Sequence, residues 1–90
     1  MATFSKTVEV INQYGIHARP AALLVKTASG FQSDIHLEKD GARVSAKSIM
    51  GLVTMEGYMG SQIIIHADGP DAEAAVLALK DLFDKKFFED

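Results

Sequence analysis

Short stretches in which apolar and polar residues alternate predict strands that bury one face. Three of them span residues 3–11, 33–39 and 61–67. Asp40-Gly41 is typical of a two-residue hairpin turn, so a fourth strand returns beside the second. This turn sets a register in which Leu37 faces Val44 and a glutamate faces an arginine. Apolar meets apolar and opposite charges meet, so the register agrees with the pattern.

Apolar residues spaced three and four positions apart predict two helices with a buried stripe. The first stripe is Ala21, Leu24, Val25 and Ala28, and the second is Ala72, Ala75, Val76, Leu79, Leu82 and Phe83. Pro20 suits the first turn of the first helix, and Gly30 is predicted to be its left-handed stop. Asp71 is predicted to cap the second helix with its side chain. Between them, Ser48 is predicted to cap a short helix over residues 49–55.

All of these elements fit into one domain. The 90 residues contain no linker, low-complexity stretch or convincing internal repeat. The predicted order is β-α-β-β-α-β-α, and strands with one apolar face bury it when helices stack on one side of the sheet. We therefore expect a single domain over residues 1–90 with an α+β fold, an open-faced β-sandwich.

Composition narrows the classes of partner. The net charge is −3, whereas general nucleic-acid binders carry a basic excess, so we expect no nucleic-acid partner. The absence of cysteine excludes disulfides and thiolate metal ligands and fits a reducing compartment. No apolar run has the length of a membrane span, and no signal peptide precedes the first strand. We expect a cytoplasmic monomer that does not insert into membranes.

The stretch Gly15-Ile16-His17-Ala18-Arg19-Pro20-Ala21 contains the candidate chemistry. His17 lies at the start of a helix whose first N–H groups lack intrahelical partners, and such an end binds anions, phosphate especially. Arg19 adds a planar, permanently charged set of donors suited to phosphate oxygens. Neutral imidazole is a competent nucleophile, and phosphoryl transfer depends mainly on positioning and charge stabilisation. The alternative, a histidine that only caps or flanks the helix, is left open by the composition.

A second stretch, Ala46-Lys47-Ser48-Ile49-Met50-Gly51-Leu52, begins the short helix. Ser48 is an N-cap, and a phosphate at a helix N-terminus is tolerated, so Ser48 is also a candidate regulatory phosphorylation site. The helix is apolar nearly all round, more than one core-facing stripe requires. Either it is buried on both sides or one face contacts a partner. We favour the partner surface, with Met50 as an adaptable contact.

Two further histidines could suggest a metal site. His36 and His66 both have the parity of the solvent-facing side of the sheet. Two ligands without a third make a poor site, so we expect exposed strand histidines and no metal.

Together these motifs resemble the HPr family, the phosphocarrier proteins of the bacterial phosphoenolpyruvate:sugar phosphotransferase system. The resemblance rests on G-I-H-A-R-P-A at 15–21, K-S-I-M-G at 47–51 and the order of elements, and it spans essentially the whole chain. It implies an HPr-like fold: a four-stranded antiparallel sheet in the order 1-4-2-3 with three helices on one face.

The resemblance also implies a stoichiometric phosphoryl carrier without a cofactor, which needs partner enzymes and is not itself an enzyme. His17 would accept a phosphoryl group on Nδ1 (the pros position) from phospho-enzyme I and pass it to IIA domains of sugar permeases, with Arg19 stabilising the phosphate. Ser48 matches the serine that an HPr kinase/phosphorylase modifies in many relatives, which in some of them creates a corepressor for a catabolite regulator. The implied partner-binding residues around the histidine are Ile16, Ala18, Ala22, Ile49, Met50 and Val53.

Two residues depart from the family pattern, and one functional alternative stays open. Tyr14 replaces a residue that is commonly small or polar, which bears on how His17 is shielded. Glu56 stands where the family usually has glycine, with Gly57 one position later, so the loop over 54–60 is expected to differ in shape. The alternative function is a regulatory adaptor of carbon or nitrogen control, switched by phosphorylation and with little role in sugar transport.

Overall fold

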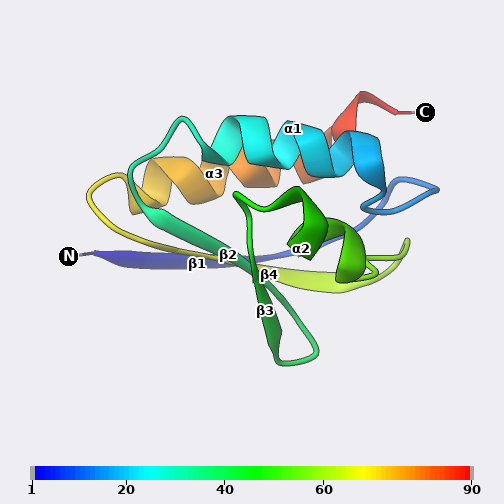
Figure 1. The fold of residues 1–90 in the computed structure, drawn as a ribbon, viewed down its shortest axis with the longest axis horizontal. Coiled ribbons are helices and arrows are strands. Elements are labelled where there is room, and N and C mark those ends of the chain that lie inside the picture. The colour runs from blue at the N-terminus through cyan, green and yellow to red at the C-terminus, as the bar shows by residue number, and fades with distance from the viewer. Residues whose placement is uncertain (1, 90) are drawn as a thin grey trace.

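The structure, a computed structural model that describes residues 2–89, contains one antiparallel sheet of four strands. The strands are β1 (Thr3–Glu9), β2 (Asp34–Lys39), β3 (Ala42–Ser45) and β4 (Gln62–Asp68), and they lie in the order β1-β4-β2-β3. The helices α1 (Ala18–Ala28), α2 (Ile49–Thr54) and α3 (Ala72–Asp84) lie on one side of the sheet (Figure 1). The expected open-faced sandwich, strand order and order of elements are confirmed.

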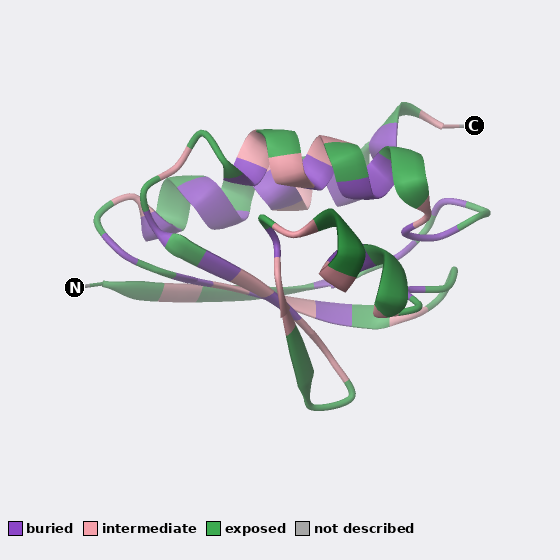
Figure 2. Ribbon diagram, viewed as in Figure 1, coloured by how far each residue is buried: buried purple, intermediate pink, exposed green. Residues whose placement is uncertain are grey.

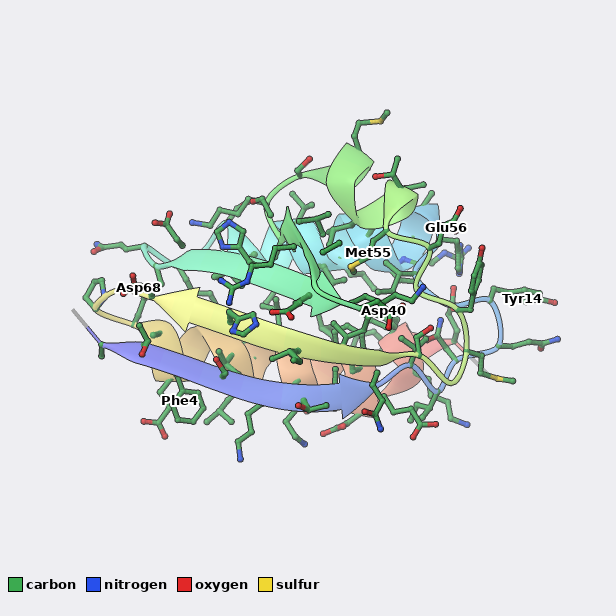
Figure 3. All side chains as sticks on the ribbon, turned by 90° about the horizontal axis from the view of Figure 1, so that it is seen from below. Phe4, Tyr14, Asp40, Met55, Glu56 and Asp68 are labelled. Carbon is green, nitrogen blue, oxygen red and sulfur yellow. The ribbon has the colours of Figure 1, made fainter. Side chains whose placement is uncertain are left out.

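Alternation within the strands determines which side chains enter the core. Val8, Ile35, Leu37, Ile63 and Ile65 are nearly or fully buried and face the helices. The side chains between them project from the open face, which is turned toward the viewer in Figure 3. The helices supply the facing layer, purple in Figure 2: Ala21, Leu24, Leu52, Ala75, Val76, Leu79 and Phe83. Burial of each large aliphatic side chain stabilises the fold by about 1.5–3 kcal/mol.

The β2–β3 hairpin has the predicted register. Leu37 pairs with Val44, and Glu38 pairs with Arg43. Asp40 and Gly41 form the turn with φ values of 52° and 84°. Left-handed conformations at both central residues match the right-handed twist of the two strands, and they are the reason that the dipeptide predicts the turn.

The end of α1 differs from the prediction. The helix finishes at Ala28, and its C-cap residue Ser29 is right-handed, with φ −67° and ψ −15°. Gly30 donates to the carbonyl of Thr27 at 3.2 Å, and it is not among the glycines with positive φ. The predicted left-handed stop at Gly30 is therefore wrong, because a tightened last turn satisfies the carbonyl instead.

The start of α3 also differs from the prediction. Asp71 occupies the N-cap position, but its side chain makes no cap hydrogen bond. Its carboxylate instead accepts the backbone N–H groups of Gln32 and Ser33, each at 2.9 Å, and the Ser33 hydroxyl. These hydrogen bonds, led by that of the Ser33 hydroxyl, lower the pKa of Asp71 below its usual value. Asp71 thus connects the start of α3 to the segment that enters β2.

The chain reverses sharply after α3. Residues Lys86–Phe88 (η1) all have left-handed backbones, with φ between 53° and 61°. Such conformations are costly outside glycine, at about 1–2 kcal/mol per residue, and they need compensation. Phe87 provides it: its ring is 1% exposed and packs edge-on against Phe83, with 4.8 Å between the centroids. The reversal directs Glu89 back toward the start of α1.

Candidate functional site

His17 occupies the N-terminal boundary of α1. Its backbone is extended (φ −87°, ψ −167°), and its carbonyl accepts the N–H of Ala21 at 3.0 Å, the first hydrogen bond of the helix. Its side chain makes no cap hydrogen bond. His17 is therefore the N-cap residue through its backbone and not through its side chain, and the ring is available for other contacts.

The ring of His17 is partly exposed and has one polar contact within residues 2–89. Its Nε2 atom lies 2.7 Å from Oε2 of Glu89, and the side chain is 40% exposed. The ring of Tyr14 approaches edge-on, with 6.2 Å between the centroids. Because a neutral imidazole carries one proton and a carboxylate only accepts, the contact with Glu89 places the proton on Nε2 and the lone pair on Nδ1.

Hydrogen-bond donors without partners directly follow His17 in the chain. The N–H groups of Ala18 and Arg19 have no hydrogen-bond acceptor in the described part of the chain, and Pro20 has no N–H. Arg19 is exposed and forms no ion pair with any described carboxylate. Free amides at a helix start and an unpaired guanidinium are suited to hold an anion.

The loop before α1 is held against a second loop. Gly15 adopts a φ of +64°, and the N–H of Ile16 donates to the carbonyl of Gly57 at 2.8 Å. A Cβ on Gly15 would lie 2.1 Å from that same oxygen. On the other side, Nδ2 of the buried Asn12 donates to the carbonyl of Gly15 at 2.8 Å. These contacts fix the backbone that leads into His17.

The second loop contains Glu56, which departs from the family pattern. Glu56 itself takes a left-handed conformation, with φ 59°, where glycine would be unstrained. Lys39 Nζ donates to its carbonyl at 2.9 Å, and the Tyr58 hydroxyl donates to its carboxylate at 3.1 Å. The Glu56 carboxylate raises the pKa of Tyr58 above its usual value. Glu56 and Tyr14 lie at the same end of the molecule (Figure 3).

Helix α2 presents an apolar face to solvent. Ile49 is 45% exposed, Met50 74% and Val53 41%, whereas Leu52 is fully buried. The helix packs beside α1 (Figure 1) and is exposed on its outer side (Figure 2). The interpretation with both sides buried is therefore wrong, and the alternative with one exposed apolar face agrees with the structure.

The other residues expected to bind partners differ in exposure. Ala18 and Ala22 are exposed on α1. Ile16 is only 4% exposed, because its side chain lies under Gly57. Ile16 therefore supports this surface from below and offers little area to a partner. Tyr58, 61% exposed, adds apolar area next to Gly15 that the sequence motifs did not indicate.

Ser48 caps α2 as predicted. Its Oγ accepts the N–H of Gly51 at 3.1 Å. Its side chain is half-buried, at the end of the helix that carries the exposed apolar residues.

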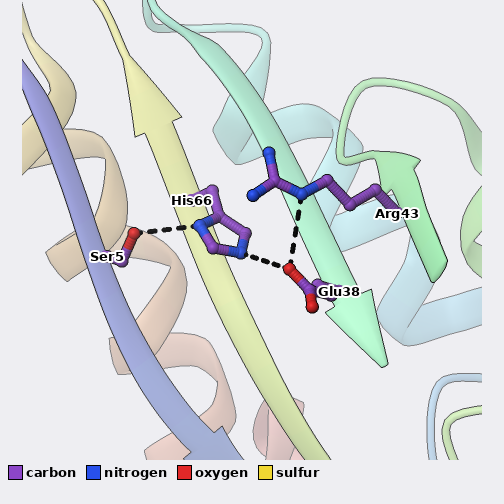
Figure 4. A network of polar contacts seen from close by, with 4 residues as sticks. All are labelled: Ser5, Glu38, Arg43 and His66. Atoms are coloured by element: carbon purple, nitrogen blue, oxygen red, sulfur yellow. Dashed lines mark hydrogen bonds and ion pairs between the residues drawn. The ribbon is translucent and has the colours of Figure 1, made fainter. Parts of the chain in front are cut away.

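The remaining histidines lie on the open face of the sheet, opposite one another in strands β2 and β4. His66 uses both ring nitrogens: Nδ1 lies 2.9 Å from Ser5 Oγ, and Nε2 lies 2.8 Å from Glu38 Oε1 (Figure 4). Arg43 also donates to Glu38, at 3.3 Å. The hydrogen bond from His66 is the main cause that lowers the pKa of Glu38. Within residues 2–89, no three side chains of the metal-binding types gather into a cluster.

Sequence reasoning missed Asn12 and Glu89. Asn12 is 1% exposed, and it reaches both the Gly15 carbonyl and the Glu89 carboxylate. Its polar side chain at the end of an otherwise apolar strand pattern was the one available signal. Glu89 had none, because its contact with His17 joins residues 72 positions apart.

Comparisons with known proteins agree with this geometry. The family described as "PTS HPr component phosphorylation site" matches residues 4–85. The chain is 51% identical over 85 residues to the phosphocarrier protein HPr of Treponema pallidum (strain Nichols), covering 94% of this chain and 97% of the relative.

Solved structures are similar over nearly the full length. HPr-C-His from Thermoanaerobacter tengcongensis superposes with a TM-score of 0.92 at 47% identity, covering 97% of this chain and 98% of the other. HPr from Bacillus anthracis str. Ames superposes with a TM-score of 0.87 at 46% identity, covering 92% and 99%. Within residues 2–89, no helix combines the length and apolar character needed to cross a membrane.

Proposed function

The chain belongs to the HPr family, the phosphocarriers of the phosphotransferase system, and from this premise we propose that Nδ1 of His17 is the atom that carries the phosphoryl group. One observation carries the proposal. Nε2 is engaged by Glu89, so the lone pair lies on Nδ1 of a ring that is 40% exposed beside free amides.

The transfer needs no proton to move. The Nδ1 lone pair forms the N–P bond while the bond between phosphorus and the donor breaks, and the electron pair of that bond stays with the donor. The proton on Nε2 remains there throughout. Arg19 and the N–H groups at the start of α1 stabilise the phosphoryl oxygens, at about 0.3–1 kcal/mol for the helix end and more for a charge-assisted hydrogen bond.

We propose that partners dock on the apolar surface beside this ring, which we define as Ala18, Ala22, Ile49, Met50 and Val53, with Ile16 beneath it. The family implies enzyme I and IIA domains as donor and acceptor. A carrier must release each partner, so we expect complexes at or below about 1,200 Å² of buried surface. Met50, 74% exposed and flexible, suits a surface that must fit two different partners.

The test is incubation with phosphoenolpyruvate and enzyme I, followed by measurement of acid-labile phosphate on the chain. The wild type is expected to be labelled, H17A to remain unlabelled, and R19A to be labelled about tenfold more slowly. H36A and H66A are matched controls, because both remove a histidine from the open face. Labelling of H17A at the wild-type level would overturn the assignment.

We also propose Ser48 as a regulatory phosphorylation site. A phosphate on its Oγ would add negative charge at the start of α2, next to the docking surface, and would still accept the N–H of Gly51. Incubation with ATP and an HPr kinase/phosphorylase is expected to give acid-stable phosphate that is absent from S48A. Modified protein is then expected to accept phosphate from enzyme I more slowly and to bind a catabolite regulator. Acid-stable labelling without any transfer through His17 would instead favour the regulatory adaptor.

We further propose that this carrier works in the cytoplasm as a single-domain monomer. The chain lacks cysteine, as suits a reducing compartment, and short-lived docking suits a single copy. One cooperative unfolding transition and a mass near 9.7 kDa in solution are expected. A stable dimer or two separate transitions would contradict this proposal.

A further inference from the structure

The C-terminal segment places a carboxylate directly against the candidate phosphorylation site. Glu89 Oε2 lies 2.7 Å from Nε2 of His17, and its side chain is only 13% exposed. The contact is therefore partly shielded from water, so it is stronger than a fully exposed ion pair or hydrogen bond.

Asn12 holds this carboxylate from the other side. Its Nδ2 donates to Oε1 of Glu89 at 3.0 Å and to the carbonyl of Gly15 at 2.8 Å, which uses both amide protons. Asn12 is 1% exposed, and its Oδ1 is buried with no hydrogen-bond partner among the described residues. A buried amide with one unsatisfied atom is costly, so a functional reason for its presence is expected.

The backbone also prepares this contact. Phe87, two residues before Glu89, is buried against Phe83 in the middle of the left-handed turn. The anchored ring limits where Glu89 can reach, and a carboxylate restricted in this way loses little further freedom when it meets the imidazole.

We propose that Glu89 is a positioning residue for phosphoryl transfer and that Asn12 acts through it. This inference rests on the proposed role of His17. By accepting the Nε2 proton, Glu89 fixes both the orientation of the ring and the tautomer whose lone pair lies on Nδ1. As the N–P bond forms, positive charge develops on the imidazole, and the carboxylate stabilises it.

Three variants test the role of Glu89. E89A removes the acceptor, E89Q keeps an oxygen acceptor without the charge, and D84N is the matched control. Asp84 is an exposed carboxylate near the end of α3 that pairs with Lys80, so D84N makes the same change of charge away from the ring. Transfer from phosphorylated enzyme I is expected to slow about tenfold in E89A, less in E89Q and not in D84N. Equal rates in E89A and the wild type would overturn the proposal.

A spectroscopic measurement distinguishes a positioning role of Glu89 from a role in stability alone. In the unphosphorylated wild type, the ¹⁵N shifts of the His17 ring are expected to show a protonated Nε2 and an unprotonated Nδ1, with the Nε2 proton slow to exchange. In E89A this proton is expected to exchange rapidly, and the two nitrogens to move toward averaged shifts. Unchanged ring shifts in a folded E89A would refute the proposal. Because this experiment involves no phosphoryl group, it reads the contact with Glu89 even where the proposed function of His17 fails.

A double-mutant cycle tests Asn12. N12A is expected to slow transfer in the wild-type background but to have no further effect when added to E89A, because Asn12 acts through the carboxylate. Independent, additive losses would refute the connection between the two residues. The unfolding midpoint of each variant is measured alongside, and the comparison of E89A with E89Q decides the role of Glu89 if N12A does not fold.

Discussion

Replacing Gly15 by alanine is expected to displace the loop that carries His17. The new Cβ would lie 2.1 Å from the Gly57 carbonyl oxygen, which also accepts the Ile16 N–H. A left-handed alanine costs about 1 kcal/mol, the overlap about 1–3 kcal/mol and the lost hydrogen bond about 1 kcal/mol. We therefore expect G15A to lower the free energy of unfolding by about 3–5 kcal/mol.

Gly41→Ala is the matched control for this change. Gly41 also has a positive φ, 84°, but apart from its two chain neighbours no atom of residues 2–89 would lie within 4 Å of a Cβ there. G41A is therefore expected to lose only about 1 kcal/mol, the cost of the left-handed backbone. Urea unfolding followed by circular dichroism gives both values. Folded G15A is also expected to accept phosphate at least tenfold more slowly, because its reacting atom has moved. Equal losses of stability in the two variants would refute the reasoning about close approach.

Three further changes test other parts of the structure. S48A is expected to lower the unfolding free energy by about 1 kcal/mol, since the N–H of Gly51 loses its acceptor; an unchanged urea midpoint would contradict the cap. F87A is expected to cost about 3–5 kcal/mol by emptying a buried site, and a loss below 1 kcal/mol would show that the ring is not packed as described. Glu38 has a lowered pKa in the folded state, so its carboxylate contributes stability that is present above the usual value of 4.5 and is lost as the pH falls through the lowered one. In E38Q, the urea midpoint is expected to depend less on pH in this acid range. An unchanged pH dependence would exclude Glu38 as its source.

The sequence predicted best those features that depend on residues close together in the chain. The β2–β3 hairpin followed from Asp40-Gly41, because only a few residue pairs favour two successive left-handed conformations. His17 and Arg19 could be recognised for a similar reason, since a helix start exposes its amides whatever the rest of the fold does. The Ser48 cap belongs to the same local class.

Contacts between distant segments could not be predicted in this way. Asp71 has the residue type of a helix cap. Its carboxylate instead accepts hydrogen bonds from two backbone amides and a hydroxyl of the loop that enters β2. Glu89 meets His17 only because Phe87 is buried and the backbone reverses after α3. Local propensity contains no information on either contact, since both depend on how the layers pack.

The position of β1 in the sheet has a consequence for synthesis on the ribosome. In the sheet β1 pairs only with β4, which lies some sixty residues later in the chain and comes between β1 and β2. A nascent chain can close the β2–β3 hairpin early, but its first strand has no strand to pair with until β4, residues 62–68, leaves the exit tunnel. Until then its apolar side chains stay in water, available to chaperones and to other unfinished chains.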